Sequence, residues 1–433
     1  MINREKQSPL IPILLVNFIG TLGFSIVLPF LVFLVMKYGG DAVVYSLLAA
    51  TYPAFQLLGS PILGKWSDTY GRKKVLLLSN AGTALGWILF LIALVLPLDG
   101  TLNVNFVYSG TVMISIPLLF IFLARAIDGI TGGNISVANA YLSDVSSEDD
   151  RSNNFGKMAI SSNLGFILGP ALAGILGGTV YGALLPVLAA LLLSIVTMCV
   201  IGFLLKESKR KSNPIVISQE GTIRKVFSQE CKDCVPPDNN MGPKFRDVFK
   251  LEHVSFLLIL YFLIFLGFNV YYSSFPTHAA HALNWSVTQL GIFYAVLSGI
   301  MVLIQGPVLK KALKKFSEEK LVIVGSVILA TNFVLFYSNN IISICMAVVL
   351  FAVGNGLMWP SFMSILSKRA GKVHQGAVQG IAGSFGGVAS IIGLIAGGIL
   401  YNLIGGVTFL ISAAIILSVF VMSFRLLKKN DCS

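Results

Sequence analysis

The chain has 433 residues, of which 55% are hydrophobic and only 12% are charged, and its mean hydropathy is +0.83. This composition excludes an ordinary soluble globular protein, which carries about twice as large a share of charged residues. The net charge of +12 lies in short blocks between apolar runs, a pattern that orients membrane helices and is not typical of nucleic-acid-binding proteins. We therefore expect a polytopic protein that has the lipid bilayer as a partner and no nucleic acid.

Apolar runs follow one another along the chain, and each is long enough to cross a hydrocarbon core of about 30 Å as a helix. They predict an all-α membrane fold with twelve transmembrane helices. The first run continues through Pro29 without a small-residue cleavage site, so we expect no cleavable signal peptide. The predicted spans are 9–36, 44–63, 75–97, 111–141, 158–178, 184–205, 254–275, 287–309, 321–338, 341–366, 375–400 and 406–425.

Basic residues mark one side of this arrangement. By the positive-inside rule, the segments that carry them are cytoplasmic, and so are both termini. The polar stretch 206–253 has no sustained periodicity, so we predict a cytoplasmic linker between a six-helix bundle at 1–205 and a second one at 254–433. A regulatory role for this linker stays open. Nearly all Lys and Arg residues lie at 64–74, 142–157, 206–253, 310–320, 367–374 and the termini.

The two halves look like repeats of one unit. A shift of 246 positions superimposes the turn after the second span on the turn after the eighth. Transporters built from two such halves usually bind substrate near the middle of the membrane and rock about it. The second turn has lost the acid at the place of Asp68 and the glycine at the place of Gly71. The superimposed residues are 61–63 on 307–309, Lys65 on Lys311, Tyr70 on Phe316, and Lys74 on Lys320.

The turn after the second span is too polar for hydrocarbon, so it forms a tight hairpin at the membrane face. Gly64 and Gly71 permit close backbone approach, and Asp68 can cap a helix N-terminus. The pattern G-x-x-x-D-x-x-G-R-[RK]-[RK] resembles the signature of major facilitator superfamily transporters. The resemblance implies that Asp68 and Arg72 clasp the two halves at the cytoplasmic gate in the outward-open state, and we choose Asp144 as the partner of Arg72. A plain positive-inside loop is the alternative.

The fourth run carries a charged pair deep in the bilayer. Arg125 and Asp128 lie about one turn apart on one helix face. Charges at this depth cost several kcal/mol unless they are paired or face a wet cavity. A substrate or a conformational change that disturbs the pair can therefore let Asp128 take up or release a proton. We predict proton coupling at Asp128 and Arg125, and a static structural pair is the alternative.

The fifth run combines small residues with a proline, at Gly165, Gly169, Pro170 and Gly174. It resembles the glycine–proline motif of facilitator-family antiporters, and the region 53–178 is most similar to the tetracycline and multidrug/proton antiporter branch. A tight-packing face would look much the same. Antiporters of the tetracycline branch also have buried acids in helices 1 and 3, whereas residues 17–29 and 82–90 contain none. Tetracycline as the substrate and the coupling stoichiometry therefore stay open.

The resemblance places helices 1, 4, 7 and 10 around a central cavity. Polar residues in these runs have helical spacing, so one face of each helix can meet water. They indicate a mostly uncharged pocket with aromatic rings, suited to an amphipathic organic molecule that is neutral or cationic. For each residue, an interhelical hydrogen bond is the alternative. The candidates are Asn17, Thr21, Ser25, Asn269, Tyr272, Ser273, Asn355 and Trp359, joined by Tyr52 and Gln56 from the second run.

Two further pairs carry metal-binding side chains without a complete ligand set. Cys231 and Cys234 have the spacing of a zinc half-site or redox pair, but no second pair follows. His278 and His281 are expected in or near the external loop after Pro276. A metal, redox or pH-sensing role stays open for these pairs, and we expect no cofactor and no metal.

Together these patterns predict a secondary transporter, a monomer in a cell or bacterial inner membrane, that exports a small organic compound against proton entry by alternating access. Uptake of a nutrient or metal-chelating metabolite, by symport or facilitated diffusion, is the first alternative. A membrane-bound enzyme or a non-transporting receptor is the second. We find no nucleophile–base constellation or phosphate loop in the sequence that would favour an enzyme.

Overall fold

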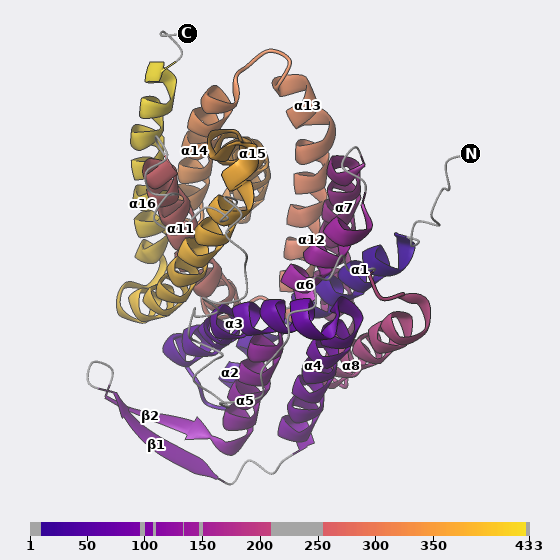
Figure 1. Ribbon diagram of the computed structural model, residues 1–433. Coiled ribbons are helices and arrows are strands. Elements are labelled where there is room, and N and C mark those ends of the chain that lie inside the picture. The colour runs from indigo at the N-terminus through magenta and orange to yellow at the C-terminus, as the bar shows by residue number, and fades with distance from the viewer. Residues whose placement is uncertain are drawn as a thin grey trace.

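The computed structural model describes residues 10–95, 100–106, 110–132, 134–146, 150–208 and 254–429. These residues form a bundle of long helices with one small β-hairpin (Figure 1). Most of the predicted linker 206–253, and with it Cys231 and Cys234, lies outside the described residues.

The N-terminal half begins with a broken helix. A proline at the start of α1 suits the first helical turn, where its missing N–H is not needed. Asp41 caps α3, because its Oδ1 accepts a hydrogen bond of 2.9 Å from the Val44 N–H. The helices are α1 (Ile11–Ser25), α2 (Leu31–Lys37), α3 (Ala42–Tyr70), α4 (Arg72–Val95), α5 (Ile116–Thr131), α6 (Asn134–Val145), α7 (Arg151–Gly177) and α8 (Leu184–Cys199), which ends in the π-helical turn Val200–Leu204.

One predicted boundary in this half is wrong. The fourth span was expected from residue 111, but strands β1 (Thr101–Phe106) and β2 (Gly110–Ser115) form an antiparallel hairpin there, and α5 begins only at Ile116. The β-branched residues of β2 favour an extended chain. Pro117, in the first turn of α5, sets the start of the helix.

The C-terminal half repeats the helical arrangement. A capping box opens α12, in which Ser286 and Gln289 each accept a hydrogen bond from the other's backbone N–H. The helices are α11 (Val254–His281), α12 (Val287–Leu303), α13 (Leu309–Ala312), α14 (Glu318–Leu335), α15 (Ile341–Ile404) and α16 (Thr408–Ser423). A π-helical turn at Ile304–Val308 joins α12 to α13, and 3₁₀ turns at Gly405–Val407 and Phe424–Lys429 flank α16.

The helix α15 supplies two antiparallel arms. Trp359 and Gly386 would lie about 40 Å apart in a straight helix, yet both lie against the ring of Tyr261. The chain therefore doubles back between them. The connection expected at 367–374 is helical in the structure, in keeping with its good helix formers such as Lys368 and Ala370.

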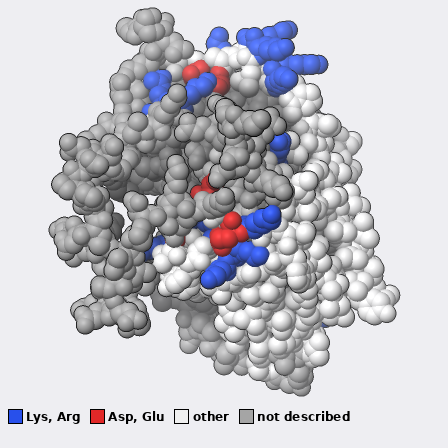
Figure 2. All heavy atoms as spheres, turned by 45° about the vertical axis from the view of Figure 1, so that its right-hand side comes forward, with Lys and Arg blue, Asp and Glu red and all other residues white. Residues whose placement is uncertain are grey.

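The described residues supply twelve helical segments that can cross a membrane. Nine helices in the described part of the chain are long and apolar enough to cross a membrane, and the last of these, Val378–Leu427, contains both the second arm of α15 and α16. The shorter helices α1 and α14 add the remaining two. Large apolar side chains such as Phe203 and Leu403 are 88% and 74% exposed on the outside, as a lipid-facing surface requires. On the face drawn in Figure 2, the charged side chains of the described residues gather in patches, and a wide area of other residues lies beside them on the right.

The two halves meet along α7 with α12 and along α3 with α15. Thr288 Oγ1 donates a hydrogen bond of 2.9 Å to the Gly174 carbonyl, and Asn402 Nδ2 donates one of 3.4 Å to Asp41 Oδ2. In the N-terminal half, these contacts involve the start of α3 and the end of α7. Both lie away from the turn between α3 and α4. The contact reaches the middle of α3, where Leu57 touches Gly387.

Candidate functional site

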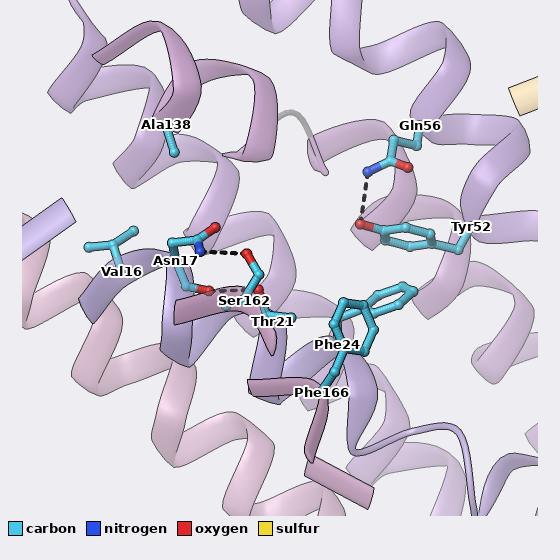
Figure 3. Close-up of a pocket in the computed structure, with 10 residues that line it drawn as sticks. Val16, Asn17, Thr21, Phe24, Tyr52, Gln56, Ala138, Ser162 and Phe166 are labelled. Carbon is cyan, nitrogen blue, oxygen red and sulfur yellow. Dashed lines mark hydrogen bonds between the residues drawn. The ribbon is translucent and has the colours of Figure 1, made fainter. Parts of the chain in front are cut away.

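A pocket of about 160 Å³ opens between α1, α3, α6 and α7 (Figure 3). Its wall is polar but uncharged on two sides and aromatic between them. Asn17 and Ser162 lie on one side, Tyr52 and Gln56 on the other. The lining residues are Val16, Asn17, Gly20, Thr21, Phe24, Tyr52, Gln56, Ala138, Ser162 and Phe166.

The amide groups of the pocket are fixed by hydrogen bonds. Asn17 Nδ2 donates to Ser162 Oγ at 2.7 Å and to the Met158 carbonyl at 3.1 Å. Gln56 Nε2 donates to Tyr52 Oη at 3.0 Å and to the Gly132 carbonyl at 2.9 Å. Because the amide nitrogens are used within the protein, their orientation leaves the amide oxygens as acceptors for a ligand.

Aromatic rings form the rest of the wall. The ring of Phe24 lies 5.1 Å from that of Tyr52 and 6.2 Å from that of Phe166, measured between centroids. Rings at these distances provide a flat apolar surface with a polarisable face. The pocket therefore offers stacking area together with a few fixed hydrogen-bonding groups.

The buried ion pair of α5 lies behind this wall. Arg125 Nη1 is 3.2 Å from Asp128 Oδ2, and Thr83 Oγ1 donates to Asp128 Oδ1 at 2.8 Å. The guanidinium of Arg125 also lies over the ring of Tyr52, 4.6 Å from its centroid. Its Nε is buried and makes no hydrogen bond within the described part of the protein. The predicted pair is therefore formed, next to the pocket and in contact with its wall.

Close helix packing holds Tyr52 in place. A Cβ on Gly129 would lie 2.5 Å from the Tyr52 carbonyl oxygen and 2.9 Å from Phe55 Cβ. Only glycine at this position lets α5 approach α3 so closely. The spacing between Tyr52 and the Arg125–Asp128 pair thus depends on a backbone contact.

The structure brings only part of the predicted cavity set to this pocket. Asn17, Thr21, Tyr52 and Gln56 line it, whereas Phe24, Ser162 and Phe166 were not singled out from the sequence. Phe24 lies seven residues after Asn17, two helical turns along the same face. This spacing could have identified Phe24, but only polar residues were selected from the first run. Ser162 and Phe166 lie one turn apart on α7, beside the residues assigned to its glycine motif.

The remaining cavity candidates lie elsewhere. Ser25 is fully buried and donates to the Gly165 carbonyl at 3.0 Å. Asn269 Nδ2 donates to Ser390 Oγ at 3.0 Å, joining α11 to the second arm of α15. Asn355 Nδ2 lies 3.3 Å from Met301 Sδ. Ser273 is fully buried. Tyr272 packs among the rings of Phe268 and Tyr271. Trp359 packs among the rings of Tyr261, Phe265 and Phe362.

The glycine–proline motif of α7 contacts two different helices. Gly165 and Gly169 lie against the backbone of α1, where a Cβ on Gly165 would be 2.9 Å from the Phe18 carbonyl oxygen. Gly174 lies against α12 of the other half, and a Cβ there would be 3.2 Å from Gly291 Cα. Pro170 lies between these contacts, so the motif joins the pocket helix α1 to the interface between the halves.

The turn between α3 and α4 carries a compact charge cluster. Arg72 Nη1 is 2.7 Å from Asp68 Oδ1, and Arg72 Nε is 3.0 Å from Asp144 Oδ2. Gly71 has φ +102°, which L side chains rarely adopt. Gly64 has no neighbouring atom where its Cβ would stand. The expected contact between Arg72 and Asp144 is present, and its role in a cytoplasmic gate stays a prediction.

The cap of α4 comes from an unexpected residue. Asp68 was expected to be able to cap a helix, but it pairs with Arg72 instead. Glu207 Oε1 accepts hydrogen bonds from the backbone N–H groups of Arg72 and Lys73, at 2.7 and 3.2 Å. A carboxylate is favoured at a helix N-terminus. The first residues of the predicted linker therefore stabilise the turn, a contact that sequence spacing could not show.

The expected loop position of the two histidines is wrong. Helix α11 continues through Pro276 and ends at His281, so His278 and His281 lie in its last turn. His278 is buried and its Nδ1 lies 3.2 Å from Tyr401 Oη. Among the described residues no group of three or more His, Cys, Asp or Glu side chains could hold a metal ion.

Comparison with known proteins agrees with this architecture. The sequence pattern of the Major Facilitator Superfamily matches residues 13–311 and, in an overlapping second match, residues 257–431. The chain belongs to the Major Facilitator Superfamily, and it is a multi-pass integral membrane protein and a transporter.

Curated relatives include two named resistance proteins. The chain is 27% identical over 351 residues to the class C tetracycline resistance protein of Escherichia coli, covering 81% of this chain and 78% of the relative. It is 24% identical over 407 residues to multidrug resistance protein 2 of Bacillus subtilis (strain 168), covering 92% and 90%. Among solved structures, a D-xylose–proton symporter is similar with a TM-score of 0.70 and 13% identity, covering 95% of this chain and 96% of that one, which shows the shared fold alone.

Proposed function

We propose that this transporter exports an amphipathic small organic compound in exchange for protons. The observation that carries the proposal is the contact between the buried Arg125–Asp128 pair and Tyr52, a residue of the pocket wall. The names of the relatives, tetracycline resistance and multidrug resistance proteins, support export of a drug-like compound.

The pocket chemistry supports an amphipathic cargo. Phe24, Tyr52 and Phe166 offer rings for stacking, and Asn17 and Gln56 offer fixed amide groups. A sugar or a phosphate compound would need many hydrogen-bond donors or several cations. The lining residues in the described part of the chain carry no charge, which suits an amphipathic compound that is neutral or has a single positive charge on an aromatic body.

Proton coupling follows from the electrostatics of the pair. A charged Asp128 neutralises Arg125 at a distance of 3.2 Å. Protonation of the carboxyl removes that attraction and leaves a buried guanidinium that must find another partner. Because the guanidinium rests on Tyr52, its shift changes the position of a ring that the cargo contacts. Proton binding and cargo binding then influence each other in both directions.

Alternating access follows from the two halves, which we take as residues 1–205 and 254–433. Their contacts lie toward one end, at α7 with α12 and at the start of α3. We place this end outside and the α3–α4 turn, both termini and the linker in the cytoplasm, following the distribution of basic residues. The protein then works as a monomer in a bacterial inner membrane, with its cytoplasmic ends apart in this conformation.

Flux in proteoliposomes tests the proposal. Purified protein is reconstituted, and ethidium or tetracycline movement is followed by fluorescence after an acid-interior or an alkaline-interior pH jump. Exchange predicts that a transported probe moves up its concentration gradient into the acidic compartment. Movement in the same direction as protons would instead establish symport, and probe movement indifferent to the pH gradient would establish facilitated diffusion.

A further inference from the structure

Two ion pairs occupy equivalent places in the two halves with opposite polarity. Arg72 is the first residue of α4, and Glu318, 246 positions later, is the first residue of α14. Their partners lie near the end of the next span: Asp144 on α6 and Lys368 on the first arm of α15. The N···O distances are 3.0 Å and 2.6 Å. The basic residue Arg72 of the first half therefore occupies the position that the acidic residue Glu318 occupies in the second half.

In each pair, the residue on the fourth span of its own half is the more exposed one. The side chains of Arg72 and Glu318 are 15% and 17% exposed, whereas those of Asp144 and Lys368 are 30% and 68% exposed. The two residues able to turn toward a new partner are thus on equivalent spans of the two halves. They carry opposite charges.

Reversed polarity matters because the halves are pseudo-symmetric. When such halves rock together at one end, equivalent helix ends approach each other. A faithful repeat would bring an acid of the second half toward Asp144, and like charges in contact oppose association. The observed reversal brings Lys368 toward Asp144 instead. The second turn is otherwise strongly basic, with Lys310, Lys311, Lys314, Lys315 and Lys320.

We propose that Asp144 and Lys368 form an ion pair across the two halves when the cytoplasmic ends close. Each leaves its partner inside its own half to do so. The partners left behind keep other contacts: Arg72 stays 2.7 Å from Asp68 Oδ1, and Glu318 Oε1 still accepts from Ser364 Oγ at 2.7 Å. The exchange therefore strands neither a buried acid nor a buried base.

This inference rests on the alternating access proposed above and not on the identity of the cargo. It names the second-half partner for the cytoplasmic charge cluster. Its test therefore uses readouts that need no transported compound.

Cross-linking detects the closed state directly. In a background with the five native cysteines replaced by serine, Asp144→Cys and Lys368→Cys are combined and treated with a short bismaleimide in membranes. An intramolecular cross-link is expected to accumulate, because even a minor closed population is trapped irreversibly. The variant Glu318→Cys with Lys368→Cys, whose native side chains are already in contact, verifies that the reagent reacts. Failure of the first pair to cross-link while the second succeeds overturns the proposal.

Charge exchange separates a pair across the halves from pairs within them. Spin labels on Tyr70→Cys and Phe316→Cys, exposed sites of 62% and 54% on the two turns, report the closed fraction. Asp144→Lys and Lys368→Asp are each expected to lower the ratio of closed to open molecules roughly threefold, the size typical of a solvent-facing ion pair. The double variant is expected to restore it, although each pair within a half then joins two like charges.

Two controls complete the test. Arg72→Asp with Asp144→Arg restores the pair within the first half but sets a base opposite Lys368, so the closed fraction is expected to stay low. Lys315→Asp with Glu319→Lys exchanges charges on the second turn outside the proposed pair, and it is expected to leave the fraction unchanged. Recovery in the Arg72–Asp144 exchange, or none in the Asp144–Lys368 exchange, contradicts a pair across the halves.

Discussion

The guanidinium of Arg125 lies on the ring of Tyr52, 4.6 Å from its centroid. Tyr52 also lines the pocket and accepts a hydrogen bond from Gln56 at 3.0 Å. One side chain thus touches both the buried charge pair and the space in which a cargo would lie. This contact is the physical basis for coupling in our account.

Replacing Tyr52 tests that contact. Tyr52→Phe keeps the ring under Arg125 and loses only the hydroxyl that accepts from Gln56. Tyr52→Leu removes a ring that lines the pocket, and a partly desolvated contact between such a ring and a cationic ligand is worth roughly 1 to 2 kcal/mol. We expect the leucine variant to lose on the order of tenfold in apparent ethidium affinity and the phenylalanine variant much less. Saturation curves for ethidium flux make the comparison, and equal curves for both variants would separate the ring from the function.

Two glycines of the α3–α4 turn give a matched pair of substitutions. Gly71 has φ +102°, and a Cβ on it would lie 2.7 Å from a carboxylate oxygen of Glu207. Gly71→Ala is therefore expected to destabilise the protein by about 1 kcal/mol or more. Gly64 lies inside α3 with free space around it, so Gly64→Ala is expected to be neutral or slightly stabilising. Thermal unfolding in detergent compares them, and the reverse order would refute this reading of the turn.

The cap provided by Glu207 can be weakened selectively. Glu207→Gln keeps the length of the side chain but removes the charge at the N-terminus of α4. We expect a loss of roughly 0.5 kcal/mol, because the contact faces solvent. Lys206→Gln changes an exposed neighbour and is the control. Thermal unfolding at low and high salt should show a deficit in the first variant that shrinks as salt rises, and a salt-independent deficit would argue against an electrostatic cap.

The sequence predicted the helical architecture because its signals are local. Apolar runs of spanning length, alternating basic connections and the complete turn motif each lie within one stretch of chain. The pairing of Arg125 with Asp128 was predictable for the same reason, since the two lie one turn apart. The contact of Arg72 with Asp144 required the resemblance to a family as well.

What the sequence could not show depends on contacts between distant segments. Glu207 caps a helix 135 positions earlier, and no local pattern marks it. Phe24 and Phe166 read as ordinary lipid-facing or core residues until α1, α3 and α7 are packed together. The extension of α11 through Pro276 to His281 was missed because a proline inside a helix was interpreted as its end.

The contact between α7 and α12 should control which side of the protein is closed. A Cβ on Gly291 would lie 2.6 Å from Gly174 Cα and 2.7 Å from the Pro170 carbonyl oxygen. Gly291→Ala is therefore expected to push the two halves apart at this end. Gly299→Ala on the same helix meets nothing within 4 Å and is the control. Maleimide labelling of Thr288→Cys from the outside should become several-fold faster with Gly291→Ala, and unchanged labelling would show that this contact does not close the outer side.

The most direct test of the central claim is proton movement with and without Asp128. In proteoliposomes with a pH-sensitive dye inside, an ethidium gradient is expected to drive proton flux in the opposite direction through the wild-type protein. Asp128→Asn keeps a side chain of the same shape for Thr83 but cannot carry a proton or neutralise Arg125. We expect this variant to insert and fold and to show no ethidium-driven proton flux. Proton flux at the wild-type rate in Asp128→Asn would contradict the assignment of coupling to this pair.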